Sequence, residues 1–134
     1  MFRILGLDHL VLRVINLAVM QRFYGDVLGC TLEREEPGLG LTQLRAGGSL
    51  IDLVPVDQPL GAKGGAAPGV EGRNLDHFCL AIEPFDAAQI GRHLQAHGVP
   101  FSEAQTRYGA QGFGPSIYVT DPEGNTVELK GPPS

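Results

Sequence analysis

The chain has 134 residues, 43% of them hydrophobic, and carries a net charge of −5 with a pI of about 5.2. This length and apolar fraction suit a single domain, residues 1–134, with its own core. The acidic balance argues against nucleic acid as a partner, because a protein that binds nucleic acid is expected to present a basic face.

The sequence shows no pattern typical of a membrane span or a signal peptide. No stretch approaches the roughly 18 uncharged apolar residues of a membrane span. The apolar N-terminal segment is interrupted by Asp8, His9 and Arg13, which argues against a signal peptide. Cys30 and Cys79 form no recognisable disulfide framework. We therefore expect a cytoplasmic protein that does not bind membranes.

The first strong pattern along the chain is a repeat. The phrase Leu-Asp-His-Leu at residues 7–10 returns as Leu-Asp-His-Phe at residues 75–78. Each copy continues as a short apolar run bounded by polar or turn residues, which is typical of a buried strand. The chain therefore reads as two related modules.

A helix is predicted after each of these runs. Asn16 is a good N-cap for the first helix, and Gly29 suits the left-handed residue at its end. Asp86 and Gly98 bound the second helix in the same way. Apolar residues at helical spacing give each helix one buried stripe, namely Met20, Phe23, Tyr24, Val27 and Leu28 in the first and Ala87, Ile90 and Leu94 in the second.

Paired strands are predicted toward the end of each module. In the first module they span residues 41–44 and 50–54, around a turn at Gly47-Gly48. In the second they span residues 116–120 and 126–130, around the turn Asp-Pro-Glu-Gly-Asn, whose residues favour tight turns. The glycine-rich segment 106–116 suits a mobile loop.

These elements predict an α+β fold built from two tandem βαβββ modules. The first module covers about residues 5–55 and the second about residues 75–130. The stretch between them, residues 56–74, is rich in glycine, proline and alanine and has the composition of a linker.

The repeat singles out four side chains. His9 and His77 occupy the same position in the first strand of their modules, and Asp52 and Glu128 the same position in the last strand. If the modules pack about a pseudo-twofold axis, these side chains face one another across a cleft. Two imidazoles and one carboxylate are the ligand set of many open divalent-metal sites. We therefore predict that His9, His77 and Glu128 bind one metal ion, with the shorter Asp52 as a candidate fourth ligand.

The sequence resembles the vicinal oxygen chelate superfamily, which includes glyoxalase I, fosfomycin-resistance thiol transferases, extradiol dioxygenases and bleomycin-resistance proteins. The resemblance covers nearly the whole chain. It rests on the Leu-Asp-His phrases, on Arg-Phe-Tyr at residues 22–24, and above all on the segment from Tyr118 to Asn125 that leads to Val-Glu-Leu at residues 127–129. It implies an open, cupped mixed sheet around the metal.

The resemblance also implies roles for single residues. His9, His77 and Glu128 fall on the metal-ligand positions, and Asp52 falls where glyoxalase I enzymes usually place a fourth ligand, a glutamate. Tyr118 falls on a substrate-facing tyrosine and Arg13 on a substrate-binding arginine. In a catalytic interpretation, Tyr108 or Arg107 of the segment 106–116 also reaches the substrate. The family further implies a homodimer, in which the cleft is completed either within one chain or between two.

Several functions remain open at this point. The first is a metal-dependent enzyme for a small oxygen-chelating substrate, with glyoxalase-like lyase or isomerase chemistry in which Glu128 or Asp52 acts as the base. The metal would be zinc, nickel, manganese or ferrous iron. Alternatives are an extradiol iron(II) dioxygenase, a thiol transferase of the fosfomycin-resistance type with a thiol co-substrate, or a non-catalytic binding protein of the bleomycin-resistance type.

Overall fold

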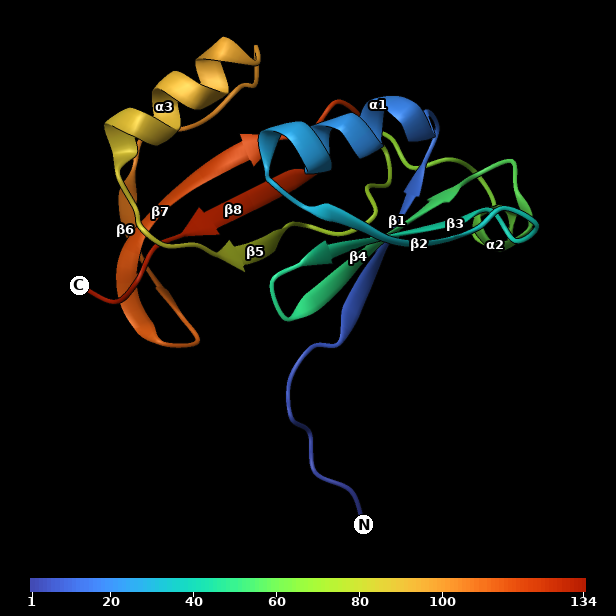
Figure 1. Cartoon of the computed structure of the whole chain (residues 1–134), viewed down its shortest axis with the longest axis horizontal. Coiled ribbons are helices and arrows are strands. Elements are labelled where there is room, and N and C mark those ends of the chain that lie inside the picture. The colour runs from blue at the N-terminus through green and yellow to red at the C-terminus, as the bar shows by residue number, and fades with distance from the viewer. The chain divides into compact units, whose positions relative to one another are not determined.

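The computed structural model describes all residues 1–134 and divides them into two compact units, Met1–Asn74 and Leu75–Ser134. Each unit is a four-stranded mixed sheet with a helix (Figure 1). The boundary falls directly before the second Leu-Asp-His phrase. None of the helices is long and apolar enough to cross a lipid bilayer.

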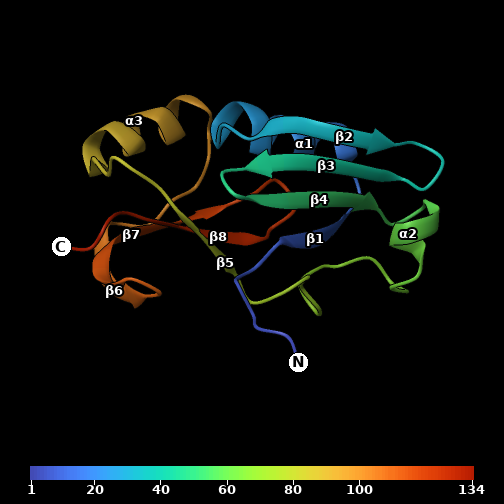
Figure 2. The ribbon, with the colours of Figure 1, turned by 60° about the horizontal axis from the view of Figure 1, so that its bottom comes forward.

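The first unit contains one sheet with the strand order β1-β4-β3-β2. Figure 2 shows these strands side by side, with the helix α1 behind them. β1 runs parallel to β4, and the other neighbours are antiparallel. The elements are β1 (His9–Val14), α1 (Leu17–Arg22), the π-helical turn η1 (Phe23–Val27), β2 (Thr31–Glu36), β3 (Leu41–Ala46), β4 (Ser49–Pro55) and the short helix α2 (Pro59–Ala62).

Strand alternation divides the first sheet into two chemically different faces. One face holds the apolar core, in which Leu12 on β1 is paired to Leu53 on β4 and both are fully buried. α1 covers this face with Met20, while Phe23 and Tyr24 of η1 complete the core. The other face carries polar side chains and contains both candidate metal ligands of this unit.

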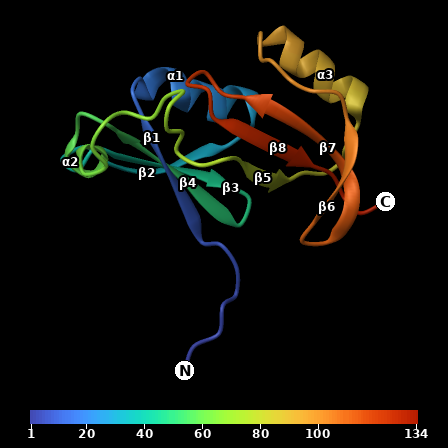
Figure 3. The ribbon, with the colours of Figure 1, turned by 180° about the vertical axis from the view of Figure 1, so that it is seen from behind.

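The second unit repeats the design with the strand order β5-β8-β7-β6. β5 runs parallel to β8, and α3 lies on one side of β7 and β8 (Figure 3). Asp86 caps α3 by accepting a hydrogen bond from the backbone N–H of Gln89 at 3.0 Å. The elements are β5 (Phe78–Ala81), α3 (Ala87–Ala96), β6 (Gln105–Gly109), β7 (Gly112–Thr120) and β8 (Thr126–Lys130).

The turn between β7 and β8 is held by one buried carboxylate. Asp121 accepts hydrogen bonds from the backbone N–H groups of Glu123 and Asn125, both at 2.9 Å, and from the Asn125 side chain at 2.8 Å. These bonds satisfy backbone N–H groups of the turn that would otherwise need water as a hydrogen-bond partner. The turn thereby fixes the register that places Tyr118 beside Glu128.

The α+β fold of two βαβββ modules is confirmed, as are the caps at Asn16 and Asp86. Two details were predicted wrongly. The segment 106–116 is not a loop, because β6 and the start of β7 form a hairpin there. The first helix is not α-helical throughout, since its second half, Phe23–Val27, is a π-helical turn.

Candidate metal centre

In the first unit, His9 and Asp52 lie on the polar face of the sheet. The parallel register places Asp52 beside Val11, so His9 is its neighbour two residues earlier on the same face. The distance from His9 Nε2 to Asp52 Oδ2 is 3.9 Å. Asp52 is only 4% exposed, and the Gln43 amide donates to both of its oxygens, at 3.1 and 3.2 Å.

The second unit places His77 and Glu128 in the equivalent positions. Glu128 pairs with Cys79 in the parallel register, and His77 precedes Cys79 by two residues on the same face. His77 Nε2 lies 3.4 Å from Glu128 Oε1, and Glu128 is 7% exposed. No side-chain amide donates to this carboxylate, in contrast to Asp52.

Each histidine is oriented by the aspartate that precedes it. His9 Nδ1 lies 2.7 Å from an oxygen of Asp8, and His77 Nδ1 lies 2.5 Å from an oxygen of Asp76. A carboxylate at this distance requires a proton on Nδ1, so the remaining nitrogen, Nε2, is the one available to a ligand. The hydrogen bond to Asp8, followed by the charge of Asp52, raises the pKa of His9.

This arrangement favours a cation at both pairs. With Nδ1 protonated, the lone pair of Nε2 and the oxygen of the neighbouring carboxylate are both acceptors directed at the same region. Two acceptors repel each other unless a proton or a metal ion lies between them. Each pair therefore offers one imidazole nitrogen and one carboxylate oxygen to a cation. Neither unit alone gathers three or more His, Cys, Asp or Glu side chains that could hold a metal ion.

Tyr118 and Arg107 extend the polar face of the second unit beside His77. The rings of Tyr118 and His77 meet edge to face with centroids 5.5 Å apart, and the Arg107 guanidinium lies 4.3 Å from the Tyr118 ring centre. Arg107 is held there by Ser116, whose backbone oxygen and hydroxyl accept hydrogen bonds at 3.1 and 2.6 Å. The Tyr118 side chain thus lies where a substrate near His77 would meet it.

Tyr108 lies on the opposite face of this sheet. In the β6–β7 register Tyr108 pairs with Phe113, whereas its neighbour Arg107 pairs with Gly114, on the face of Tyr118. Tyr108 is 72% exposed, and its ring packs against Phe113 at 5.0 Å. Within this unit the structure therefore places Arg107, and not Tyr108, on the face of His77 and Tyr118, and substrate binding by either residue stays a prediction.

Arg13 shares the face of His9, but its guanidinium donates hydrogen bonds to the segment that follows β4. Its three nitrogens donate to the backbone carbonyls of Gly61 at 2.8 Å, Gly65 at 2.6 Å and Ala66 at 2.9 Å. The side chain of Asn74 closes the same edge by bonding both the N–H and the C=O of Arg13 at 3.0 Å. The Arg13 guanidinium thus holds the segment 61–66 through these carbonyls, and its contact with a substrate stays a prediction.

Cys79 borders the second pair as an unreactive thiol. Desolvation of the sulfur, followed by the negative charge of Glu128, raises its pKa to about 11. The thiol is therefore protonated at neutral pH and is a poor nucleophile. Lys130, two residues beyond Glu128, is also buried on this face and donates to the Gly112 carbonyl at 3.0 Å.

Sequence reasoning missed the partners of the predicted ligands. Asp8 and Asp76 carried a usable signal, because the aspartate is repeated together with the histidine. Gln43 carried none, since its contact with Asp52 depends on the register of β3.

The chain matches a family model over residues 6–129, that of the Glyoxalase/Bleomycin resistance protein/Dioxygenase superfamily. Solved structures resemble it over nearly the whole chain. An integron cassette protein from the mobile metagenome of V. cholerae is 28% identical with a TM-score of 0.76, covering 98% of each chain. A virulence protein of Salmonella typhimurium is 26% identical with a TM-score of 0.79, covering 97% of this chain and 98% of that one.

An enzyme of assigned activity shares the fold at lower identity. Lactoylglutathione lyase from Agrobacterium tumefaciens is 20% identical with a TM-score of 0.67, covering 95% of this chain and 93% of that one.

Proposed function

Because the chain belongs to the glyoxalase/bleomycin resistance protein/dioxygenase superfamily, we propose that it is a metal-dependent enzyme for a small substrate with two adjacent oxygen atoms. Glyoxalase-like lyase or isomerase chemistry is the reaction class proposed. The observation that carries the proposal is the His77–Glu128 pair, in which the imidazole Nε2 of a partly exposed histidine lies 3.4 Å from an oxygen of the buried glutamate.

In this proposal the metal ligands are His9, His77 and Glu128. The donor set suits zinc, nickel, manganese or ferrous iron, because it combines imidazole nitrogens with a carboxylate oxygen. Asp52 is the weaker candidate, since both of its oxygens already accept hydrogen bonds from Gln43. The pairs from the two modules would meet either within one chain or between the chains of a homodimer.

The chain's own residues would divide the chemistry as follows. A bound divalent ion supplies Lewis acidity that stabilises negative charge on the substrate oxygens. Glu128 would serve as the base if it leaves the ion during turnover, and it is chosen over Asp52 because no side-chain amide donates to it. Tyr118 would donate a hydrogen bond from its hydroxyl to a substrate oxygen, with its ring fixed between His77 and Arg107.

A thiol, if the reaction uses one, would come from a co-substrate. Cys79 is the cysteine nearest the proposed ligands, and its raised pKa of about 11 leaves it protonated at neutral pH. The assays therefore include glutathione with methylglyoxal as the first substrate pair. Fosfomycin with thiols and catechol with oxygen test the thiol-transferase and dioxygenase alternatives.

The decisive comparison uses protein loaded separately with zinc, nickel, manganese and iron(II). We expect one of these forms to isomerise the methylglyoxal–glutathione adduct, and Glu128→Gln to lose at least about a hundredfold in kcat, as removal of a general base does. His93→Ala, on α3, is the matched control and should leave the rate unchanged. Turnover by Glu128→Gln equal to wild type would refute the role of Glu128. Ligand binding without turnover of any substrate would favour the binding-protein alternative.

A further inference from the structure

The first unit contains a pocket on the face of its sheet that is turned away from His9 and Asp52. Its volume is about 480 Å³, and all its lining residues belong to the first unit. Thr42 of β3 lines it, and Thr42 pairs with Leu53, on the face that α1 covers. The next residue, Gln43, points to the other face and holds Asp52. The sheet therefore separates this pocket from the proposed metal ligands.

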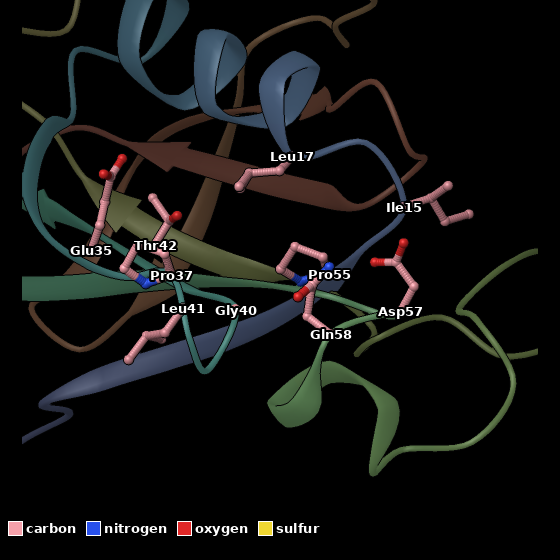
Figure 4. A pocket seen from close by; sticks show the side chains of 10 residues that line it. All are labelled: Ile15, Leu17, Glu35, Pro37, Gly40, Leu41, Thr42, Pro55, Asp57 and Gln58. Atoms are coloured by element: carbon pink, nitrogen blue, oxygen red, sulfur yellow. The ribbon is translucent and has the colours of Figure 1, made fainter.

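The charges at the pocket are all negative. Glu35 and Asp57 line it, and no lysine, arginine or histidine does. The other glutamates of β2 have cationic partners, because Glu33 pairs with Arg45 and Glu36 with Arg34. Glu35 and Asp57 have none. Figure 4 shows Glu35 on the side of Thr42 and Asp57 on the side of Ile15.

A second, independent feature is the hydroxyl of Thr42. The residue is 4% exposed, yet its hydroxyl has no hydrogen-bond partner in the structure. Every fully buried side-chain nitrogen or oxygen in the chain is hydrogen-bonded, so this hydroxyl must open into the pocket that Thr42 lines. A nearly buried hydroxyl without a partner is uncommon, since leaving it unpaired costs free energy. It is a preformed acceptor for an N–H donor.

The remaining walls are mostly apolar. Leu17 at the start of α1 and Pro55 at the end of β4 lie among the polar groups (Figure 4). We propose that this pocket binds a small organic ammonium ion. Its charged nitrogen would contact Glu35 or Asp57 and donate to Thr42, and its carbon chain would pack on Leu17 and Pro55. The proposal is independent of the metal chemistry on the other face.

The test titrates the full-length chain with butylammonium chloride and follows backbone amide shifts by NMR. We expect the shifts to concentrate around the pocket, with 1-butanol and butyrate binding at least about fivefold more weakly. Glu35→Gln and Asp57→Asn should each weaken butylammonium binding about three- to tenfold, the range of a partly exposed charged hydrogen bond. Thr42→Val should weaken it as well, and Thr42→Ser, which restores the hydroxyl, should recover it.

Glu33→Gln is the matched control, because it removes the same charge from the same strand outside the pocket. It should leave butylammonium affinity unchanged. The proposal is overturned if 1-butanol binds as tightly as butylammonium, or if Glu33→Gln weakens binding as much as Glu35→Gln. It is also overturned if magnesium ions shift the same amides at the same concentration, or if no butylammonium binding is detected.

Discussion

Both modules carry a histidine–carboxylate pair, but the two pairs differ in their distance and in the partners of the carboxylate. In the first module the pair is wider, at 3.9 Å, and Gln43 holds both oxygens of Asp52. In the second it is closer, at 3.4 Å, and no amide holds Glu128. The longer glutamate side chain reaches nearer to its histidine. Both modules have thus kept a histidine beside a carboxylate, but only Glu128 has the catalytic role proposed here.

The two arginines on these faces differ in a similar way. Arg13 in the first module is occupied by three backbone carbonyls of the segment after β4. Arg107 in the second lies over the Tyr118 ring next to His77. The first module thus uses its arginine for structure, and the second presents its arginine beside the candidate site.

The largest expected difference between the modules concerns metal affinity. Glu128→Gln should weaken binding of zinc or nickel at least about a hundredfold, more than the loss of a supporting residue costs. Asp52→Asn should weaken it less than about tenfold, because the carbonyl oxygen of the substituted side chain would still accept a hydrogen bond from Gln43. Calorimetric titration of both variants measures the difference. Equal losses would make Asp52 a full ligand and end the proposed asymmetry.

The turns that close the two modules should differ in their contribution to stability. Asp121→Ala removes the acceptor of three hydrogen bonds in the β7–β8 turn, and we expect it to lower the free energy of unfolding by about 3 kcal/mol. The corresponding turn of the first module relies on Gly47, whose φ is +59°. Gly47→Ala should cost about 1 kcal/mol. Denaturant unfolding compares them, and a larger loss for Gly47→Ala would contradict this account.

The arginines provide the third comparison. Arg13→Ala should lower the free energy of unfolding by about 2 kcal/mol, because three backbone carbonyls, including that of the buried Gly61, lose charged donors. It should also expose residues 61–66 to limited proteolysis while metal affinity stays the same. Arg107→Ala should leave stability within about 1 kcal/mol and raise KM for the substrate. If Arg13→Ala instead raises KM without loss of stability, Arg13 is the substrate-binding residue that the sequence predicted.

The smallest effect is expected at the aspartates that orient the histidines. Asp76→Ala should weaken metal binding about tenfold. This is the lower end of the loss in affinity expected when a residue that orients a metal ligand is removed. Asp8→Ala should do the same at His9. Glu71→Ala, in the segment between the modules, is the control for loss of one negative charge. Unchanged metal affinity in both aspartate variants would show that the Asp–His bonds serve only the local strand geometry.

The sequence predicted the elements whose patterns are local. The caps at Asn16 and Asp86, the apolar runs that become β1 and β5, and the marked turn at residues 121–125 all depend on neighbours in the chain. The position of β2 was not predicted because Thr31–Glu36 is charged and exposed, without the alternation of a half-buried strand. β6 was not predicted because Gln105–Gly109 is polar and mostly exposed, without an alternation of apolar residues.

Because β6 was not predicted, the sequence could not tell whether Arg107 or Tyr108 lies on the face of His77. In a strand, successive side chains point to opposite faces, so the choice between Arg107 and Tyr108 depends on a register that a loop does not have. The pairing of Arg107 with Gly114 decides it. Gln43 was missed for the same reason, since its contact with Asp52 exists only once β3 is paired with β4.

We propose above all that His9, His77 and Glu128 together hold one divalent ion. The most direct test of this proposal is the metal content of the wild-type chain after purification without added metal and after reloading of chelated protein. The account predicts one ion per chain, lost in His9→Ala and in His77→Ala and retained in His93→Ala. Metal that persists in His77→Ala, or a wild-type chain that takes up no divalent ion, would contradict it.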